Sequence, residues 1–259
     1  MPTPAFDPYV PFGTEPRALR ETYLELYEEA IARAYPEMDT FLEDKSHRID
    51  IDWMNGLALH TQVVVKQSAL NFQHGRMLYA LLRERADELP QDTGLVVMET
   101  GTARGFSALC MARALMDAGR SGHVVTSDLI PHHHDMIWNC IDDLDGPRSR
   151  HELLAPWSEE RDRVVFLSGD TKDSMERLGL GRVHFAFLDG AHHEEPLMGE
   201  YRYVADRQQK GDRIVFDDVT PGQFDGIVRA IARIEDEGAY DIERFMLENR
   251  RGYAIARRR

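Results

Sequence analysis

Acidic side chains directly follow two short apolar stretches of the sequence, and their grouping predicts a metal site. Asp189 follows the stretch 183–188, and Asp217 and Asp218 follow the stretch 213–216. Three carboxylates that converge in one cleft repel one another unless a cation joins them. Ligands that are all oxygen favour a hard ion, with Mg²⁺ first and Mn²⁺ or Ca²⁺ as alternatives. The other interpretation is that Asp217 and Asp218 cap the next segment and that Asp189 merely ends a strand.

Two groups of histidines are further candidates for chemistry. His192 and His193 follow Asp189 closely, and an imidazole that titrates near neutral pH can take a proton from a hydroxyl group. Either of these histidines has two alternative roles, as a metal ligand or as an exposed residue at the start of a helix. The consecutive residues 132–134 are all histidine, but neighbouring residues point in different directions and cannot all face one ion. We expect the segment 132–134 to form a loop that covers a ligand.

A glycine-containing turn at residues 99–107 (ETGTARGFS) predicts a ligand-binding loop. Gly101 and Gly105 allow the backbone to adopt positive φ and to approach a ligand closely. Their spacing is not the G-x-G-x-x-G of dinucleotide folds, and the Gly-Lys-Ser/Thr of a phosphate loop is absent. The loop therefore suits a ligand without phosphates, and Glu99 suits a cationic amino acid group. A plain turn that needs glycine for its geometry is the alternative.

Two more acids follow later apolar runs of the sequence. Asp128 comes after the run 123–126, where a carboxylate can accept hydrogen bonds from both hydroxyls of a ribose. Dinucleotide enzymes use an acid in the same way, so Asp128 points to nucleosides in general. Asp170 and Thr171 come after the run 163–167, where a contact to the edge of an adenine would lie. The alternative role for Asp170 is a helix N-cap.

The elements that must position these residues alternate between strands and helices, which predicts a doubly wound α/β fold. Short apolar runs typical of buried strands alternate with helical patterns; the runs are 95–98, 123–126, 163–167, 183–188 and 213–216. Two more strands around residues 249–251 would close a mostly parallel, Rossmann-like sheet of seven strands with an antiparallel pair. In such sheets ligands bind beyond the carboxyl ends of the strands, where the acids lie. We expect residues 1–92 to form a helical cap and residues 93–259 to form the core.

The composition of the chain limits the kinds of binding partner that we expect. The net charge of −14 repels a phosphate backbone, so we expect no nucleic acid partner. Residues 1–7 lack a basic region followed by an apolar run, so we expect no signal peptide, and no apolar stretch is long enough to span a membrane. The two cysteines form no disulfide framework, which suits the cytoplasm. We expect a small-molecule partner, and the sequence leaves homo-oligomerisation open.

The glycine loop together with the later acids resembles the class I methyltransferases that depend on S-adenosylmethionine. Over residues 64–220, the similarity is closest to the metal-dependent O-methyltransferases, including the catechol and macrolide-sugar enzymes and the cephalosporin-hydroxylase-like branch. This resemblance implies direct transfer of a methyl group to a hydroxyl of a sugar, polyol or phenol, in natural-product tailoring. It also implies that S-adenosylmethionine and Mg²⁺, or another divalent cation, are the cofactors.

The resemblance also assigns roles to single residues. Residues of the loop would bind the methionine end of the cofactor: Glu99, Gly101, Thr102, Gly105 and Ser107. Asp128 would bind the ribose, and Asp170 or Thr171 the adenine side. The metal would be held by Asp189, Asp217 and Asp218, and His192 matches the offset of the general base.

Three other classes of protein stay open as alternatives, and one of them is a metal-dependent enzyme that acts on a β-lactam or a peptide without methyl transfer. An oxidoreductase with a Rossmann-like fold would be expected to carry the dinucleotide loop, which the sequence lacks. A non-catalytic protein that binds a nucleoside or S-adenosylmethionine predicts that the acid cluster holds no metal.

Overall fold

The sheet of the computed structural model, which describes residues 6–247 and 251–259, has seven strands in the order β3-β2-β1-β4-β5-β7-β6. The strands are β1 (Leu95–Thr100), β2 (Gly122–Asp128), β3 (Val164–Ser168), β4 (Phe185–Leu188), β5 (Arg213–Phe216), β6 (Tyr240–Met246) and β7 (Gly252–Arg258). The first five pair in parallel, and β7 runs antiparallel to both β5 and β6. The predicted Rossmann-like fold with a closing antiparallel pair is confirmed. The predicted turn of that pair includes residues 248–250, which lie outside the described residues.

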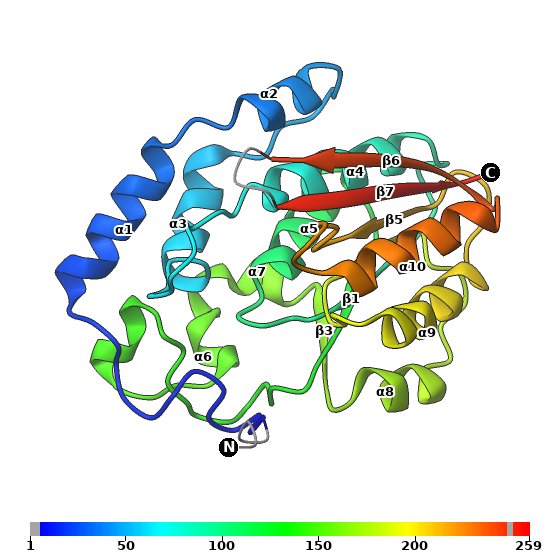
Figure 1. Cartoon of the computed structure of the whole chain (residues 1–259). Helices are drawn as coiled ribbons and strands as arrows, with labels where there is room; N and C mark the ends of the chain where they lie inside the picture. The colour runs from blue at the N-terminus through cyan, green and yellow to red at the C-terminus, as the bar shows by residue number, and fades with distance from the viewer. Residues whose placement is uncertain (1–5, 248–250) are drawn as a thin grey trace.

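Helices cover both faces of the sheet (Figure 1). On one face lie α4 (His74–Asp87) and α5 (Phe106–Asp117), and on the other lie α8 (Thr171–Arg177), α9 (Glu194–Ala205) and α10 (Asp225–Asp236). Towards the N-terminus are α1 (Arg20–Ala32), α2 (Pro36–Glu43) and α3 (Ile51–Thr61). The short elements are η1 (Ile141–Asp145), α6 (Arg150–Leu153), η2 (Ala155–Trp157) and α7 (Ser158–Arg161).

Alternation of side chains along the buried strands builds two hydrophobic cores, one on each face. Because successive side chains of a strand point to opposite faces, Val97 belongs to the core beneath α4 and α5, whereas Met98 belongs to the core beneath α9 and α10. Phe185 and Ala186 divide between the two cores in the same way. Strands buried on both faces are continuous apolar runs, which is why the sequence reveals them.

The N-terminal helices share a core with the sheet. Tyr23, Met38 and Leu57, from α1, α2 and α3, lie in the same buried cluster as Val97 and Phe106. Helix α4 packs against α5, so it is part of the layer on this face of the sheet. The expected boundary at residue 92 therefore does not coincide with a break in the hydrophobic core.

The segment between β2 and β3 differs most from expectation. The apolar residues from Met136 to Leu144 predict a helix, which is wrong: the backbone there is irregular except for η1. Met136 pairs instead with Arg148 in an isolated antiparallel bridge, and Asn139 has a φ of +53°. The indole of Trp138 is fully buried in this segment. Packing of such side chains outweighs the local preference for a helix, so the backbone is irregular.

Two smaller features bear on the expectations from composition. Cys110 and Cys140 are buried free thiols. Among the described helices, none combines the length and the apolar character needed to cross a bilayer.

Candidate active site

The turn from β1 into α5 lies directly against the end of β4. Gly101 has a φ of +83°, and a Cβ added there would lie 2.4 Å from the carbonyl oxygen of Asp189. Gly105 also has a positive φ, of +95°. Glycine at 101 is therefore required both for the backbone conformation and for the contact between the two strand ends. This contact brings the predicted loop and the first acid of the predicted metal site together.

A cavity of about 1090 Å³ opens at the carboxyl ends of the first four strands. Each of these strands contributes a predicted site residue to its wall: Gly101 after β1, Asp128 at the end of β2, Asp170 after β3 and Asp189 after β4. Thr171 and the side chains of α8 and α9 complete the wall. The volume matches that of sites for ligands the size of a nucleoside cofactor. We call this space the larger cavity.

The two acids expected to bind the nucleoside are held by backbone amides. The carboxylate of Asp128 accepts hydrogen bonds from the backbone N–H of Ala103, at 2.6 Å, and of Ile130, at 2.8 Å. Asp170 accepts bonds from the amides of Lys172, at 2.9 Å, and of Asp173, at 3.4 Å. Asp170 is therefore the N-cap of α8 while it also lines the cavity. Amide bonds fix both carboxylates and leave oxygen lone pairs for a ligand.

Glu99 lies behind the loop and lines neither cavity of the site. Its fully buried carboxylate accepts a hydrogen bond from the hydroxyl of Thr126, at 2.5 Å, and its Oε1 has no partner among the described residues. Burial raises the pKa of Glu99 to about 7, against the lowering effect of hydrogen bonds from Ser107 and Thr126. Thr102 is buried too, with its hydroxyl 2.5 Å from that of Thr126. An orphaned carboxylate oxygen behind the loop suits a nearby cationic group.

Replacing Glu99 with glutamine is expected to change how stability depends on pH. An acid whose folded pKa is raised keeps its proton in the folded state after the unfolded chain has lost it. The stabilisation is therefore full below pH 4.5 and is lost as the pH rises towards 7. The difference between these two pKa values corresponds to about 3 kcal/mol.

Urea unfolding of the cofactor-free protein tests this prediction. Between about pH 5 and pH 8 the wild type should lose about 2 kcal/mol or more relative to Glu99→Gln. Glu200, whose pKa burial also raises to about 7, is unchanged in both proteins and drops out of the comparison. Parallel pH profiles for the two proteins would contradict the prediction.

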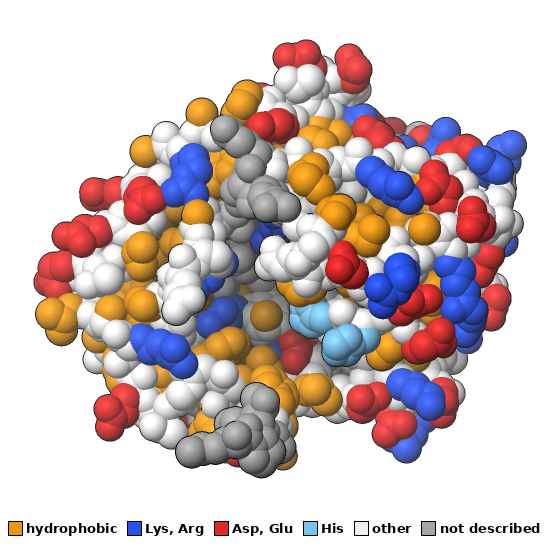
Figure 2. Space-filling model, viewed as in Figure 1, with side chains coloured by type: hydrophobic (Ala, Val, Ile, Leu, Met, Phe, Trp, Pro, Cys, Tyr) orange, Lys and Arg blue, Asp and Glu red, His pale blue; other side chains and the backbone are white. Residues whose placement is uncertain are grey.

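A smaller cavity of about 310 Å³ adjoins the larger one. The two share Gly101, Ala103 and Asp189, so they meet at the contact between β1 and β4. The N-terminal part of the chain supplies much of the wall of the smaller cavity, through Phe12, Gln62, Val64, Lys66 and His74. Figure 2 shows this face hollowed between the N-terminal helices and the core, with Lys or Arg side chains inside the hollow and His side chains at its edge.

The smaller cavity is lined by cations. Lys66, Arg104 and Arg251 contribute to its wall, and Ser107 lies there as well. Burial lowers the pKa of Lys66, and so does the positive charge of Arg251 and Arg104. A wall of this charge stabilises an oxyanion or another electron-rich group.

The acids predicted to hold a metal separate into two arrangements. Asp189, Asp218 and His192 each place one ligand atom within 4.8 Å of the other two. Asp217 instead forms an ion pair with Arg251, whose Nε lies 3.1 Å from Asp217 Oδ1 and whose Nη2 contacts Oδ2. Asp217 Oδ1 also accepts the backbone N–H of Asp218, at 2.7 Å. The structure thus gathers two of the three predicted acids with a histidine and gives the third a guanidinium partner.

Backbone geometry explains the separation of the two consecutive acids. Asp218 has a φ of +58°, an uncommon left-handed conformation for a residue with a side chain. The preceding Asp217 is buried, with only 3% of its surface exposed, whereas Asp218 is partly exposed. Strained backbone of this kind is concentrated at functional sites. Arg251, which sequence reasoning missed, lies 34 residues along the chain from Asp217 and carries no local signal.

The negative charge of the Asp189 carboxylate is poorly compensated by its surroundings. Burial raises the pKa of its carboxyl well above the ordinary value, and the negative charges of Asp217 and Asp218 raise it further, while Arg251 lowers it. A bound divalent cation would remove this cost, because it favours the ionised carboxylates. The set of two carboxylates and one imidazole suits Mg²⁺ or Mn²⁺ through its oxygens.

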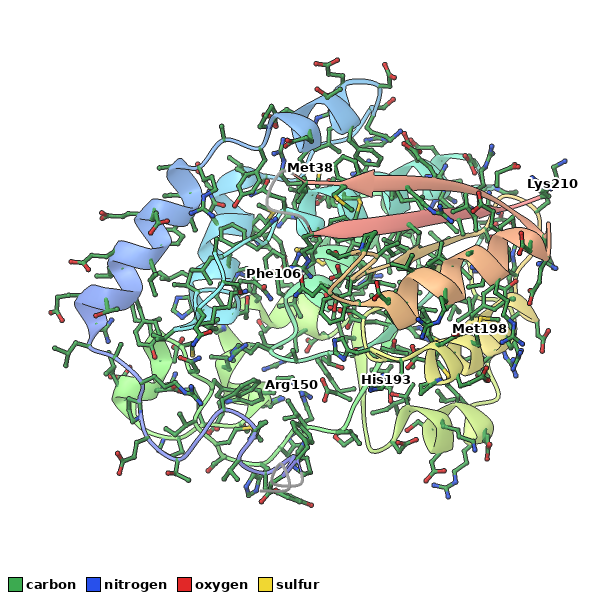
Figure 3. The ribbon with its side chains drawn as sticks, viewed as in Figure 1. Met38, Phe106, Arg150, His193, Met198 and Lys210 are labelled. Atoms are coloured by element: carbon green, nitrogen blue, oxygen red, sulfur yellow. The ribbon has the colours of Figure 1, made fainter. Side chains whose placement is uncertain are left out.

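Of the two adjacent histidines, only His192 lines the larger cavity. Its Nε2 lies 3.2 Å from Oδ2 of Asp218, and this hydrogen bond raises the pKa of His192. The ring also packs against Phe224, with centroids 5.5 Å apart. His193, labelled in Figure 3, is the residue that precedes α9. The structure therefore distinguishes His192, which lines the larger cavity, from His193, and the sequence alone does not make this distinction.

Comparison with known proteins identifies a domain and a shared fold. Residues 98–219 match the model of a methyltransferase domain. No curated protein sequence matches the chain. A cofactor-bound structure of Rv0187 from MTB is 21% identical, with a TM-score of 0.59, over 88% of this chain and 98% of that one.

Two further structures are similar in fold. An O-methyltransferase from Bacillus cereus, in complex with SAH, is 16% identical with a TM-score of 0.57, over 90% of this chain and 100% of that one. The O-methyltransferase TomG from Streptomyces achromogenes, involved in tomaymycin synthesis and in complex with SAM, is 16% identical with a TM-score of 0.57, over 85% of this chain and 95% of that one. Residues 98–219 therefore match a methyltransferase domain, and the chain shares its overall fold with these three structures.

Proposed function

We propose that the protein transfers the methyl group of S-adenosylmethionine to a hydroxyl oxygen of a small molecule, with a divalent cation at the acid cluster. The observation that carries the proposal is the meeting of the two cavities at Asp189. The larger has the volume and the carboxylates for the cofactor, and the smaller has the size of a compact acceptor. Two neighbours with the same fold are named O-methyltransferases, which supports oxygen as the acceptor atom.

Within the larger cavity, Asp128 would bind the ribose hydroxyls of the cofactor, and Asp170 and Thr171 would lie along its adenine side. The methionine end would reach Gly101 and the contact with β4. Ser107 donates a hydrogen bond to Glu99, so the two residues would act together at the cationic end of the cofactor. Ser107 lies in the wall of the smaller cavity and His192 in that of the larger one, so the acceptor would lie where the two cavities meet at Asp189.

Catalysis then depends on positioning and charge. Asp189 and Asp218 would hold the cation, which when bound lowers the pKa of an acceptor hydroxyl. His192, hydrogen-bonded to Asp218, takes the hydroxyl proton on its ring nitrogen. The acceptor oxygen attacks the methyl carbon, the new C–O bond forms, and the C–S bond breaks with its electron pair going to sulfur. The cationic wall at Lys66 stabilises the oxyanion before the attack.

The size of the smaller cavity supports a compact acceptor. Its volume of about 310 Å³ is at the lower limit of small-molecule sites, which fits a phenol, a polyol or one sugar ring. The named role of TomG in tomaymycin synthesis supports natural-product tailoring as the context. A small molecule also agrees with a chain whose net charge is −14.

A transfer assay tests the proposed function. The full chain is incubated with S-adenosylmethionine labelled in its methyl group and with a panel of phenols, polyols and sugars, in the presence of Mg²⁺ or of EDTA. We expect label on a hydroxyl oxygen with Mg²⁺, and its loss in EDTA. Transfer that persists in EDTA would contradict the metal, and label on nitrogen or carbon would contradict the acceptor atom.

The role of His192 is tested by His192→Gln. If His192 is the base, we expect turnover to fall by about 10²-fold, the range of general-base catalysis, with the affinity for Mg²⁺ unchanged. If metal affinity falls together with turnover, His192 is a ligand of the ion instead, as its position in the Asp189–Asp218 group would allow.

A further inference from the structure

A second group of metal-binding side chains lies apart from the acid cluster. His132 and His133 follow β2, and His151 belongs to α6. One ring nitrogen of each lies within 4.8 Å of the other two. In Figure 3, the labelled Arg150 marks the segment of His151, and the labelled His193 marks the neighbourhood of the acid cluster.

The consecutive histidines of the sequence do not all face one point. His134 turns away and packs edge-on against Tyr9, with centroids 4.9 Å apart. His151, from 17 residues further along the chain than His134, takes the third position, because the loop after β2 folds back on itself. Its backbone N–H donates to the carbonyl of His132, at 3.3 Å.

The three rings are spaced as ligands of one tetrahedral ion. Their centroids are 4.7 Å apart for His132–His133, 5.7 Å for His132–His151 and 5.3 Å for His133–His151. Imidazoles bound to tetrahedral zinc at about 2.0–2.1 Å would have centroids separated by about 5 Å. The planes of the rings meet edge-on or tilted, at 77° for His132–His133, 89° for His132–His151 and 41° for His133–His151.

His132 is prepared to act as a ligand. Its side chain is stacked on Phe166, with centroids 3.9 Å apart, and only 9% of the residue is exposed. Its Nδ1 is buried and has no hydrogen-bond partner among the described residues, which is costly for a polar atom. Burial lowers the pKa of His132, and the positive charge of Arg150 lowers it as well.

Positive charges near the three histidines affect which metal ion can bind there. Arg150 and Arg161 lie close enough to lower the pKa of His132, and the same field opposes any cation. A hard ion such as Mg²⁺ gains little from imidazole and would not overcome this field. Zn²⁺ binds imidazole strongly, and three histidines with one open position are a known zinc ligand set.

We propose that His132, His133 and His151 bind a Zn²⁺ ion. The ion would tie the start of the loop after β2 to its end. Arg150, next to His151, donates to the carbonyl of Ala103, at 2.7 Å, and lies 4.0 Å from Asp128. The site therefore braces the wall of the larger cavity from behind.

Cobalt titration of the full chain tests the site, because Co²⁺ occupies zinc sites and absorbs strongly in the visible when it is tetrahedral. We expect one equivalent of such absorption in the metal-stripped wild type, displaced by Zn²⁺. His133→Ala and His151→Gln should weaken Co²⁺ binding about tenfold or more, because loss of a ligand costs at least as much affinity as loss of an outer-shell partner. His134→Ala, the matched control beside the site, should titrate like the wild type.

Thermal melting separates binding from folding. Without metal, His133→Ala and His134→Ala should melt together, because both side chains are exposed. Added Zn²⁺ should raise the Tm of His134→Ala and of the wild type but not that of His133→Ala. The proposal is overturned if the wild type shows no tetrahedral Co²⁺ absorption, or if His133→Ala and His151→Gln bind Co²⁺ as the wild type does. Asp218→Asn should leave the absorption in place, which assigns it to the histidines and not to the acid cluster.

Discussion

Replacing Asp218 with asparagine is expected to lower turnover by about 10²–10³-fold while it leaves the folded protein nearly as stable as the wild type. Asp218 is partly exposed, and it faces Asp189 and His192. Its carboxylate would hold the cation that lowers the pKa of the acceptor hydroxyl, a contribution of several kcal/mol to the transition state. Initial rates at saturating Mg²⁺, with calorimetric Mg²⁺ titration, measure the effect.

Asp217→Asn is the matched control, since it changes the neighbouring acid in the same way. The side chain of Asp217 is fully buried and paired with Arg251, so the change removes the carboxylate of this ion pair. We expect a loss of about 3 kcal/mol in the free energy of unfolding, because breaking a buried ion pair is costly. If Asp217→Asn binds Mg²⁺ more weakly than Asp218→Asn does, then Asp217 is a metal ligand, as the sequence predicts.

Replacing Gly101 with alanine is expected to damage both folding and cofactor binding. The new Cβ would lie 2.4 Å from the carbonyl oxygen of Asp189, and backbone atoms cannot move aside as a flexible side chain can. Overpacking costs about 1–3 kcal/mol, and a left-handed residue with a side chain costs about 1 kcal/mol more. Moving β1 away from β4 would also open the junction of the two cavities. We therefore expect a loss of about 2–4 kcal/mol of stability and at least tenfold weaker binding of S-adenosylmethionine.

Gly222→Ala isolates the steric part of this effect. Gly222 has a φ of +79°, close to the +83° of Gly101, but an added Cβ there would meet nothing within 4 Å. This variant should lose only the cost of the left-handed backbone, about 1 kcal/mol. The free energies of unfolding are measured with urea. Equal losses for Gly101→Ala and Gly222→Ala would show that the contact with Asp189 adds no cost.

Much of the fold could be predicted because its signals are local. The runs 95–98 and 214–216 are apolar since strands buried on both faces need few polar positions, and β5 has the predicted bounds, Arg213–Phe216. The acids after those strands converge because parallel strands all end at one edge of the sheet. For residues 136–144, in contrast, the predicted helix is wrong. Their apolar side chains are buried in an irregular loop, and apolar spacing alone does not distinguish such a loop from a helix.

The parts of the site that escaped prediction depend on contacts between distant residues. The pair Asp217–Arg251 and the group of His151 with His132 are each closed by a residue far along the chain. Asp217 and Asp218 both follow the end of β5, and the left-handed backbone at Asp218, which the sequence does not reveal, gives the two carboxylates different partners.

Binding of the cofactor is the claim on which the other assignments depend, and calorimetric titration of the full chain with S-adenosylmethionine tests it directly. We predict one equivalent of binding in the wild type, unchanged in Asp218→Asn and weakened tenfold or more in Asp128→Asn, whose carboxylate lines the larger cavity. Absence of binding to the wild type, or equal affinity of Asp128→Asn and the wild type, would contradict the assignment of the larger cavity to the cofactor.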